Sequence, residues 1–148
     1  MEKIYTTKNV KETKQLAANL ALRLQQGMII TLDGQLASGK TTFTKGFGVG
    51  LNIQDPINSP TFTISKIYEG SFPLLHIDAY RLEGIDQELG FEDYFDDQWM
   101  VLIEWPMFTA HLLPKDRIDV RFEVVDETTR VITLSSSDKH ASLLEDLL

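Results

Sequence analysis

The sequence of 148 residues contains no cysteine, which excludes a disulfide framework, a thiol nucleophile and a cysteine-ligated metal site. It has no apolar run long enough for a membrane helix, and residues 1–5 are followed by no apolar segment of the kind that a secretory signal requires. Basic residues are scarce, since 14 lysines and arginines stand against 22 aspartates and glutamates, and they form no cluster. We therefore expect a cytoplasmic protein without a membrane partner and without strong direct binding to nucleic acid.

The composition is otherwise that of a globular domain. Hydrophobic residues make up 43% of the chain and charged residues 24%. The length suits one domain over residues 1–148 and leaves no room for a second, substrate-binding domain.

Residues 34–41, GQLASGKT, match the pattern GxxxxGK(S/T) of a phosphate-binding loop, or P-loop. In such a loop the glycines allow successive backbone N–H groups to turn toward the phosphates. Lys40 would contact the β- and γ-phosphates, and Thr41 would offer its hydroxyl to Mg²⁺. The loop follows an apolar run at 28–32, typical of a buried parallel strand, and precedes a predicted helix at 42–51.

The remaining pattern predicts an α/β fold. Asn9 and Glu12 predict the start of a helix that ends near Gly27, and Asp138 predicts the start of a last short helix. Two antiparallel hairpins are predicted, one from 61–68 with 73–80 and one from 118–124 with 130–134. A buried strand is predicted at 100–103 and a set of short acidic helices at 84–98. We therefore predict a P-loop NTPase fold with a mixed, mainly parallel central sheet, helices on both faces and antiparallel hairpins.

Two carboxylates are candidates for the chemistry. Glu104 directly follows the apolar run at 100–103, which is the pattern of a Walker B acid that reaches Mg²⁺ or an attacking water. Alternation along 73–80 places Asp78 on one face of a strand together with His76 and Tyr80. Because ligands bind beyond the carboxyl ends of strands in open α/β sheets, both acids are placed for such a site.

Each of these residues also has a plainer interpretation. Asp78 could pair only with Arg81, and His76 could be a hydrogen-bonded structural histidine. Tyr80 and Trp105 could serve packing alone.

Four segments in this order resemble the TsaE (YjeE) family of small bacterial P-loop ATPases, which are required to make threonylcarbamoyladenosine in tRNA. They are GQLASGKTTF, Ser59-Pro60-Thr61-Phe62, His76-Ile77-Asp78-Ala79-Tyr80-Arg81-Leu82, and Ile103-Glu104-Trp105-Pro106. The first is widespread among P-loop proteins, whereas the other three in this order are specific, and the resemblance covers nearly the whole chain.

The resemblance implies a site residue by residue. Lys40, Asp78 and Glu104 would form the catalytic set, with Thr41 and Glu104 sharing Mg²⁺ and with either acid open as the one that activates water. Thr61 would belong to a switch that senses the γ-phosphate. The implied nucleotide-binding residues are Val10, Leu36, Ala37, Ser38, Gly39, Lys40, Thr41, Thr42, Thr61, Asp78, Trp105 and Arg130.

The chain departs from the family pattern at Ala37-Ser38, where Gly-Ala is usual. If the first of these positions requires a positive φ, alanine costs about 1 kcal/mol there. We therefore expect the variation at Ala37-Ser38 to weaken nucleotide binding by this loop.

The leading hypothesis is a slow Mg²⁺-dependent ATPase that resets a protein assembly; the resemblance implies ATP as the nucleotide and TsaD and TsaB as partners. No arginine finger is evident in the sequence, so we expect weak intrinsic activity. Two alternatives stay open: a small-molecule kinase of the nucleoside type that uses the same P-loop, and a nucleotide-binding scaffold that never hydrolyses.

Overall fold

The computed structural model describes residues 1–57, 65–82, 91–96 and 98–148. A seven-stranded sheet lies at the centre, in the order β1-β7-β6-β2-β5-β4-β3. The strands are β1 (Glu2–Thr7), β2 (Ile29–Asp33), β3 (Ser65–Tyr68), β4 (Leu74–Asp78), β5 (Met100–Glu104), β6 (Ile118–Val124) and β7 (Arg130–Ser136). The α-helices are α1 (Val10–Arg23) and α2 (Lys40–Gly50), and the 3-10 helices are η1 (Ala79–Leu82), η2 (Phe91–Tyr94), η3 (Pro106–Leu112) and η4 (Asp138–Leu144).

The sheet is mixed, with a parallel centre and antiparallel edges. Strands β4, β5, β2 and β6 are parallel neighbours, whereas β3 pairs antiparallel with β4, and β7 pairs antiparallel with both β6 and β1. Only β3 and β7 therefore run against the common direction, which confirms the predicted α/β class with its mainly parallel sheet. The two described hairpins, β3 with β4 and β6 with β7, are also confirmed.

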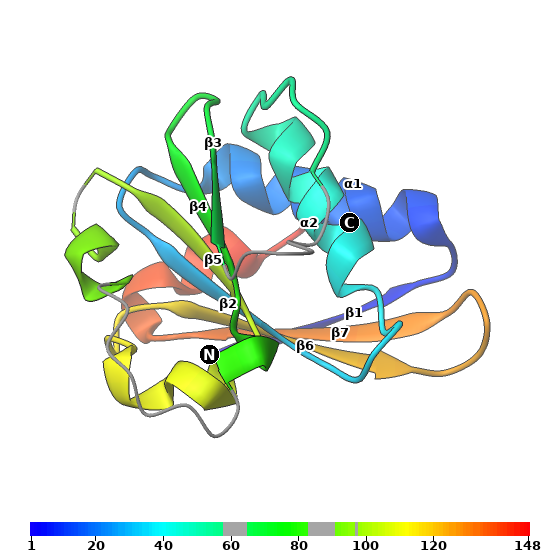
Figure 1. The fold of residues 1–148 in the computed structure, drawn as a ribbon. Helices are drawn as coiled ribbons and strands as arrows, with labels where there is room; N and C mark the ends of the chain where they lie inside the picture. Colours follow the sequence, from blue (N-terminus) through cyan, green and yellow to red (C-terminus); the bar gives the residue numbers. More distant parts are fainter. Residues whose placement is uncertain (58–64, 83–90, 97) are drawn as a thin grey trace.

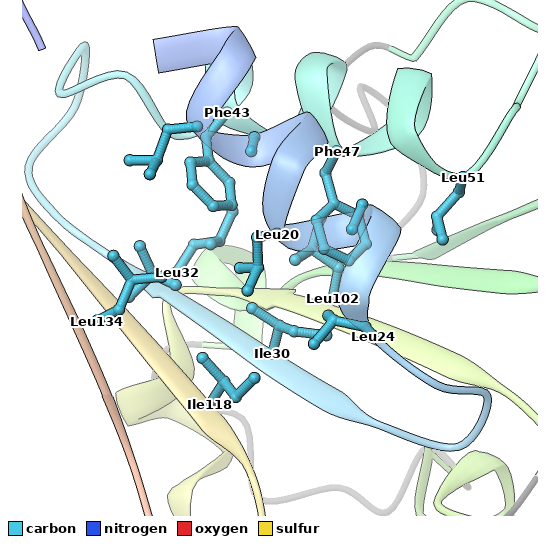
Figure 2. Packing of buried hydrophobic residues seen from close by; sticks show 14 of the residues in the cluster. Leu20, Leu24, Ile30, Leu32, Phe43, Phe47, Leu51, Leu102, Ile118 and Leu134 are labelled. Carbon is cyan, nitrogen blue, oxygen red and sulfur yellow. The ribbon is translucent and has the colours of Figure 1, made fainter. Parts of the chain in front are cut away.

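Helices α1 and α2 cover one face of the sheet, and η3, drawn in yellow, lies on the other (Figure 1). Phe43 and Phe47 of α2, together with its C-cap residue Leu51, point into the core, as their fourfold spacing predicted (Figure 2). Each such fully buried side chain contributes roughly 1.5–3 kcal/mol relative to an exposed one. A second, smaller cluster on the η3 face packs Phe108 and Leu113 against Ile77 and its neighbours.

Glycines let α2 approach α1 closely. A Cβ on Gly46 would lie 2.4 Å from the carbonyl oxygen of Lys14, and one on Gly50 would lie 2.5 Å from that of Ala18. The helix that follows the P-loop is thereby pressed against α1, which holds the loop's carboxyl end in place.

The N-terminus of α1 agrees with its predicted cap. The Asn9 Oδ1 atom accepts the backbone N–H of Glu12 at 2.8 Å, and the Glu12 carboxylate accepts the N–H of Lys8 at 2.9 Å. The helix ends at Arg23, before the predicted end near Gly27, because Leu24 takes an extended backbone with ψ 153°.

Several expectations need correction. Strand β1 was not predicted, because its alternation of charged and apolar side chains is irregular, and β4 ends at Asp78, so that Tyr80 lies in η1. The last helix is a 3-10 helix whose N-cap is Ser137, with Asp138 as its first residue. Residues 61–64 of the first hairpin and most of 84–98 lie outside the described residues. No described helix combines the length and the apolar character needed to cross a membrane.

Candidate functional site

The P-loop joins the carboxyl end of β2 to the N-terminus of α2. Gly39, with φ 108°, is the N-cap of α2, and within the described part of the chain no side chain caps its first turn. The first backbone N–H groups of a helix have no partner inside the helix, and together with the helix dipole they bind anions. The loop therefore ends in a helix N-terminus of a kind suited to phosphate, in the place that the motif predicted.

Ala37 has a φ of 62°, in the left-handed region that favours glycine. Glycine adopts this conformation without strain, whereas alanine adopts it at a cost of about 1 kcal/mol.

Arg130, the first residue of β7, braces the loop from the side. Its Nε donates to the carbonyl oxygen of Ser38 at 3.1 Å and its Nη2 to that of Ala37 at 3.4 Å. Its Nη1 donates to the carbonyl oxygens of Asp126 and Thr129. The guanidinium thus ties the turn between β6 and β7 to the strained part of the P-loop.

The Lys40 ammonium lies inside the site. Nζ donates to the carbonyl oxygen of Gly34 at 2.7 Å and lies 3.4 Å from the centroid of the Trp105 ring. Burial lowers the pKa of Lys40, while the carboxylates of Glu104, Asp78 and Asp33 act to raise it. The group is a desolvated cation that a phosphate can recruit.

The two candidate carboxylates lie side by side. Asp78 and Glu104 are register partners at the carboxyl ends of the parallel strands β4 and β5. The Asp78 Oδ1 accepts the backbone N–H of Tyr80 at 3.1 Å. Glu104 is only 3% exposed, and its Oε2 lies 3.0 Å from His76 Nε2.

Trp105 adopts a left-handed backbone, with φ 59° and ψ 57°, at the start of η3. Its backbone N–H donates to the carbonyl oxygen of Leu32 at 3.1 Å, and the centroid of its ring lies 5.0 Å from that of the Tyr80 ring. A bulky residue in this conformation is strained, and strain of this kind concentrates at functional sites. The bend turns the indole toward Lys40.

These residues line one cleft of ≈ 240 Å³. Its lining is Leu36, Ala37, Gly39, Lys40, Thr41, Thr42, Asp78, Glu104, Trp105 and Arg130. The fold therefore brings together most of the predicted site.

Three predicted residues stand apart from this lining. Val10 is exposed at the start of α1. Ser38 is buried within the loop, where its N–H donates to the carbonyl oxygen of Gln35 and its own carbonyl oxygen accepts from Arg130. Thr61 lies outside the described residues, with the rest of the SPTF segment.

The donor set fits Mg²⁺. Within the described residues no three histidine, aspartate or glutamate side chains gather into a metal cage. The cleft instead offers hard oxygen ligands in the Thr41 hydroxyl and the Glu104 carboxylate. Mg²⁺ is commonly bound in this way, by one or two protein oxygens together with substrate phosphates.

A family model described as "Threonylcarbamoyl adenosine biosynthesis protein TsaE" matches residues 7–132. The chain belongs to the TsaE family. A Bacillus subtilis tRNA threonylcarbamoyladenosine biosynthesis protein TsaE is 40% identical over 145 residues, which is 97% of this chain and 92% of that protein. The Treponema pallidum TsaE is 32% identical over 131 residues, covering 87% of this chain and 97% of that protein.

The fold agrees with the family. The crystal structure of Bacillus subtilis YdiB superposes with a TM-score of 0.81 at 35% identity, covering 99% of this chain and 94% of that chain. The predicted membership of the TsaE family is thereby confirmed.

Sequence reasoning missed two features of the site. Asp33, at the end of β2, acts on the charge of Lys40, and an acid directly before the P-loop glycine could have signalled it. The contact of His76 with Glu104 had no local signal, because the two residues meet only through the pairing of β4 with β5.

Proposed function

We propose that the protein binds ATP with Mg²⁺, hydrolyses it slowly, and through this cycle supports or resets the protein complex that makes threonylcarbamoyladenosine in tRNA. The observation that carries the proposal is the convergence of Lys40, Asp78 and Glu104 on the cleft at the N-terminus of α2. Charge stabilisation and positioning account for most of the catalysis in phosphoryl transfer, and these groups supply both.

The residues divide the work as follows. The N–H groups of the loop hold the phosphates, and Lys40 leaves the Gly34 carbonyl to contact them. Thr41 and Glu104 hold Mg²⁺, which when bound neutralises charge on the phosphate oxygens. Asp78, beside Glu104 and half-buried, orients the attacking water.

Weak intrinsic turnover is part of the proposal. Arg130 is the one arginine among the described residues that line the cleft, and it donates four hydrogen bonds to main-chain carbonyl oxygens. An arginine that stabilises the transition state increases turnover by about 10³–10⁵-fold in related reactions. We therefore propose that a partner accelerates or controls hydrolysis.

TsaD and TsaB type proteins are the proposed partners. The relatives from Bacillus subtilis and Treponema pallidum carry names that place them in threonylcarbamoyladenosine biosynthesis. The acidic chain, with its net charge of −8, suits action on another protein better than direct binding to tRNA.

The test follows the γ-phosphate of labelled ATP, with the protein alone and with purified TsaD and TsaB. Release as free phosphate, stimulated by the partners, supports the proposal. Transfer of the label to a nucleoside or another metabolite supports the kinase alternative instead, and binding without any turnover supports the scaffold.

Variants on α2 make the test specific to the site. Lys40→Ala is expected to lower turnover by at least about 10²-fold, because it removes the charge at the phosphates. Lys45→Ala is the matched control, since Lys45 is an exposed lysine on the same helix outside the cleft lining. Equal activity of the two variants would contradict the assigned role of Lys40.

A further inference from the structure

His76 and Glu104 form a buried pair behind the cleft. His76 Nε2 lies 3.0 Å from Glu104 Oε2, and their side chains are 1% and 4% exposed. His76 is the register partner of Leu102, so Glu104 is its diagonal neighbour two residues further along β5. Side chains at such diagonal positions share a face of the sheet and are close enough for long side chains to meet.

Two neighbours of His76 within the sheet are apolar. Leu74 and Leu102, which flank His76 on its own strand and on β5, belong to the main core cluster. A buried imidazole costs free energy that an apolar side chain of similar size would not, unless the ring makes a needed hydrogen bond. Within the described residues the Nδ1 atom has no hydrogen-bond partner, so the ring's polar side-chain contact is the hydrogen bond between Nε2 and Glu104, which packing alone does not require.

We propose that His76 is a positioning residue for Glu104. The Nε2–H tautomer donates to Oε2, which fixes the carboxylate rotamer and leaves Oε1 for a cation at the cleft. Metal-binding carboxylates are commonly held by such hydrogen bonds, and loss of the bond typically costs about 10–100-fold in metal affinity. The inference rests on the proposed role of Glu104 as a Mg²⁺ ligand.

The arrangement separates two tasks among neighbouring residues. His76 and Asp78 lie on the same face of β4. His76 contacts Glu104 from within the core, whereas Asp78 lies beside Glu104 in the lining of the cleft. Removing His76 should therefore weaken the metal site and leave the phosphate contacts of the P-loop in place.

The experiment measures binding of an ATP analogue that carries an N-methylanthraniloyl fluorophore, first in EDTA and then as MgCl₂ is added. His76→Gln and His76→Met are a matched pair, since both side chains are unbranched and of similar size but only glutamine retains an N–H donor. We expect His76→Met to raise the Mg²⁺ concentration for half-maximal enhancement about 10–100-fold. Its binding in EDTA should equal that of the wild type, and His76→Gln should restore most of the Mg²⁺ response.

Two further variants distinguish the possible failures. Glu104→Gln tests the proposed function: if it leaves the Mg²⁺ response unchanged, Glu104 is not a ligand and the role of His76 falls with it. If Glu104→Gln shifts the response and His76→Met does not, only the positioning role is overturned. His140→Met is the control. His140 Nε2 lies 2.6 Å from Asp116 Oδ1, and neither residue lines the cleft, so this variant should leave the Mg²⁺ response unchanged.

Folding is monitored in the same series. Should His76→Met not fold, His76→Asn takes its place, because its shorter amide retains polarity but does not reach Glu104. An unchanged Mg²⁺ response in folded His76→Asn overturns the proposal, and a raised requirement supports it.

Discussion

The Lys40 Nζ lies 3.4 Å from the centroid of the Trp105 ring, and both residues line the cleft. A cation–π contact of a desolvated ammonium is worth about 2 kcal/mol or more, and the hydrogen bond to the Gly34 carbonyl adds to it. In the proposed function Lys40 contacts phosphates, and to do so its ammonium would leave these two partners. Nucleotide binding would therefore change the environment of the indole.

This coupling predicts a fluorescence change at Trp105. In a Trp99→Phe background, Trp105 is the one remaining tryptophan, because the chain has two. Addition of ATP and Mg²⁺ should change its emission as the ammonium leaves the ring. In Trp99→Phe with Lys40→Met, the emission before nucleotide should already differ and the response should disappear. A full response in the Lys40→Met background would show that the contact is not what the indole reports.

Ala37 provides a test of backbone strain. Ala37→Gly should remove the cost of φ 62°, about 1 kcal/mol, against about 0.4–1 kcal/mol of added entropy in the unfolded chain. We expect no loss of stability, a gain of up to about 0.6 kcal/mol, and tighter nucleotide binding, measured by urea unfolding and by titration. Ala18→Gly, in the middle of α1, is the control and should lose about 1 kcal/mol. Loss of stability in both variants would contradict a strained loop.

The contact between α1 and α2 predicts opposite effects for two glycines on one helix. Gly46→Ala places a Cβ 2.4 Å from a backbone oxygen of Lys14, and such overpacking typically costs about 1–3 kcal/mol. Gly48→Ala comes closer than 3.0 Å only to the terminal Cδ1 atom of Ile57, at 2.2 Å, which is the far end of a flexible side chain rather than backbone. A helical alanine gains about 1 kcal/mol over glycine, which offsets the shift of that methyl group. Thermal unfolding should place Gly46→Ala below and Gly48→Ala at or above the wild type. A higher melting temperature for Gly46→Ala than for Gly48→Ala would mean that the helices do not pack as described.

Asp126 predicts an acid dependence of the turn that presents Arg130. Hydrogen bonds from the backbone N–H groups of Thr128 and Thr129 lower the pKa of Asp126 below its ordinary value of 3.8. A lowered carboxyl pKa stabilises the folded state fully above the unfolded pKa, and this contribution is lost as the pH falls through the folded value. Asp126→Ala should therefore lower the melting temperature at pH 7, with the difference from wild type shrinking below about pH 4.

The neighbouring acid gives the control for this prediction. Glu127→Ala removes a carboxylate of the same turn, but one that makes no hydrogen bond with the described residues. Its melting curve should therefore follow that of the wild type across the pH range. A pH-independent difference for Asp126→Ala would show that the turn depends on something other than the ionised carboxylate.

Much of the fold could be predicted from local pattern. The cap of α1, the strand before the P-loop and the spacing of Phe43, Phe47 and Leu51 on α2 were all readable, because capping and periodicity act over a few residues. Strand β1 was not, because its place at the edge is set by pairing with β7, more than 120 residues away in the chain. The 3-10 form of η4 likewise had no local signal.

The site divides along the same line. The sequence by itself determined the P-loop motif and the groups that it offers, since the turn, the lysine and the hydroxyl all lie within residues 34–41. It also indicated Asp78 and Glu104 as acids at strand ends. Only the tertiary structure decided that they are register partners, that Arg130 braces the loop, and that His76 lies against Glu104. The physical reason is that these contacts join strands that are distant in the chain, so they depend on the order in which the sheet pairs its strands.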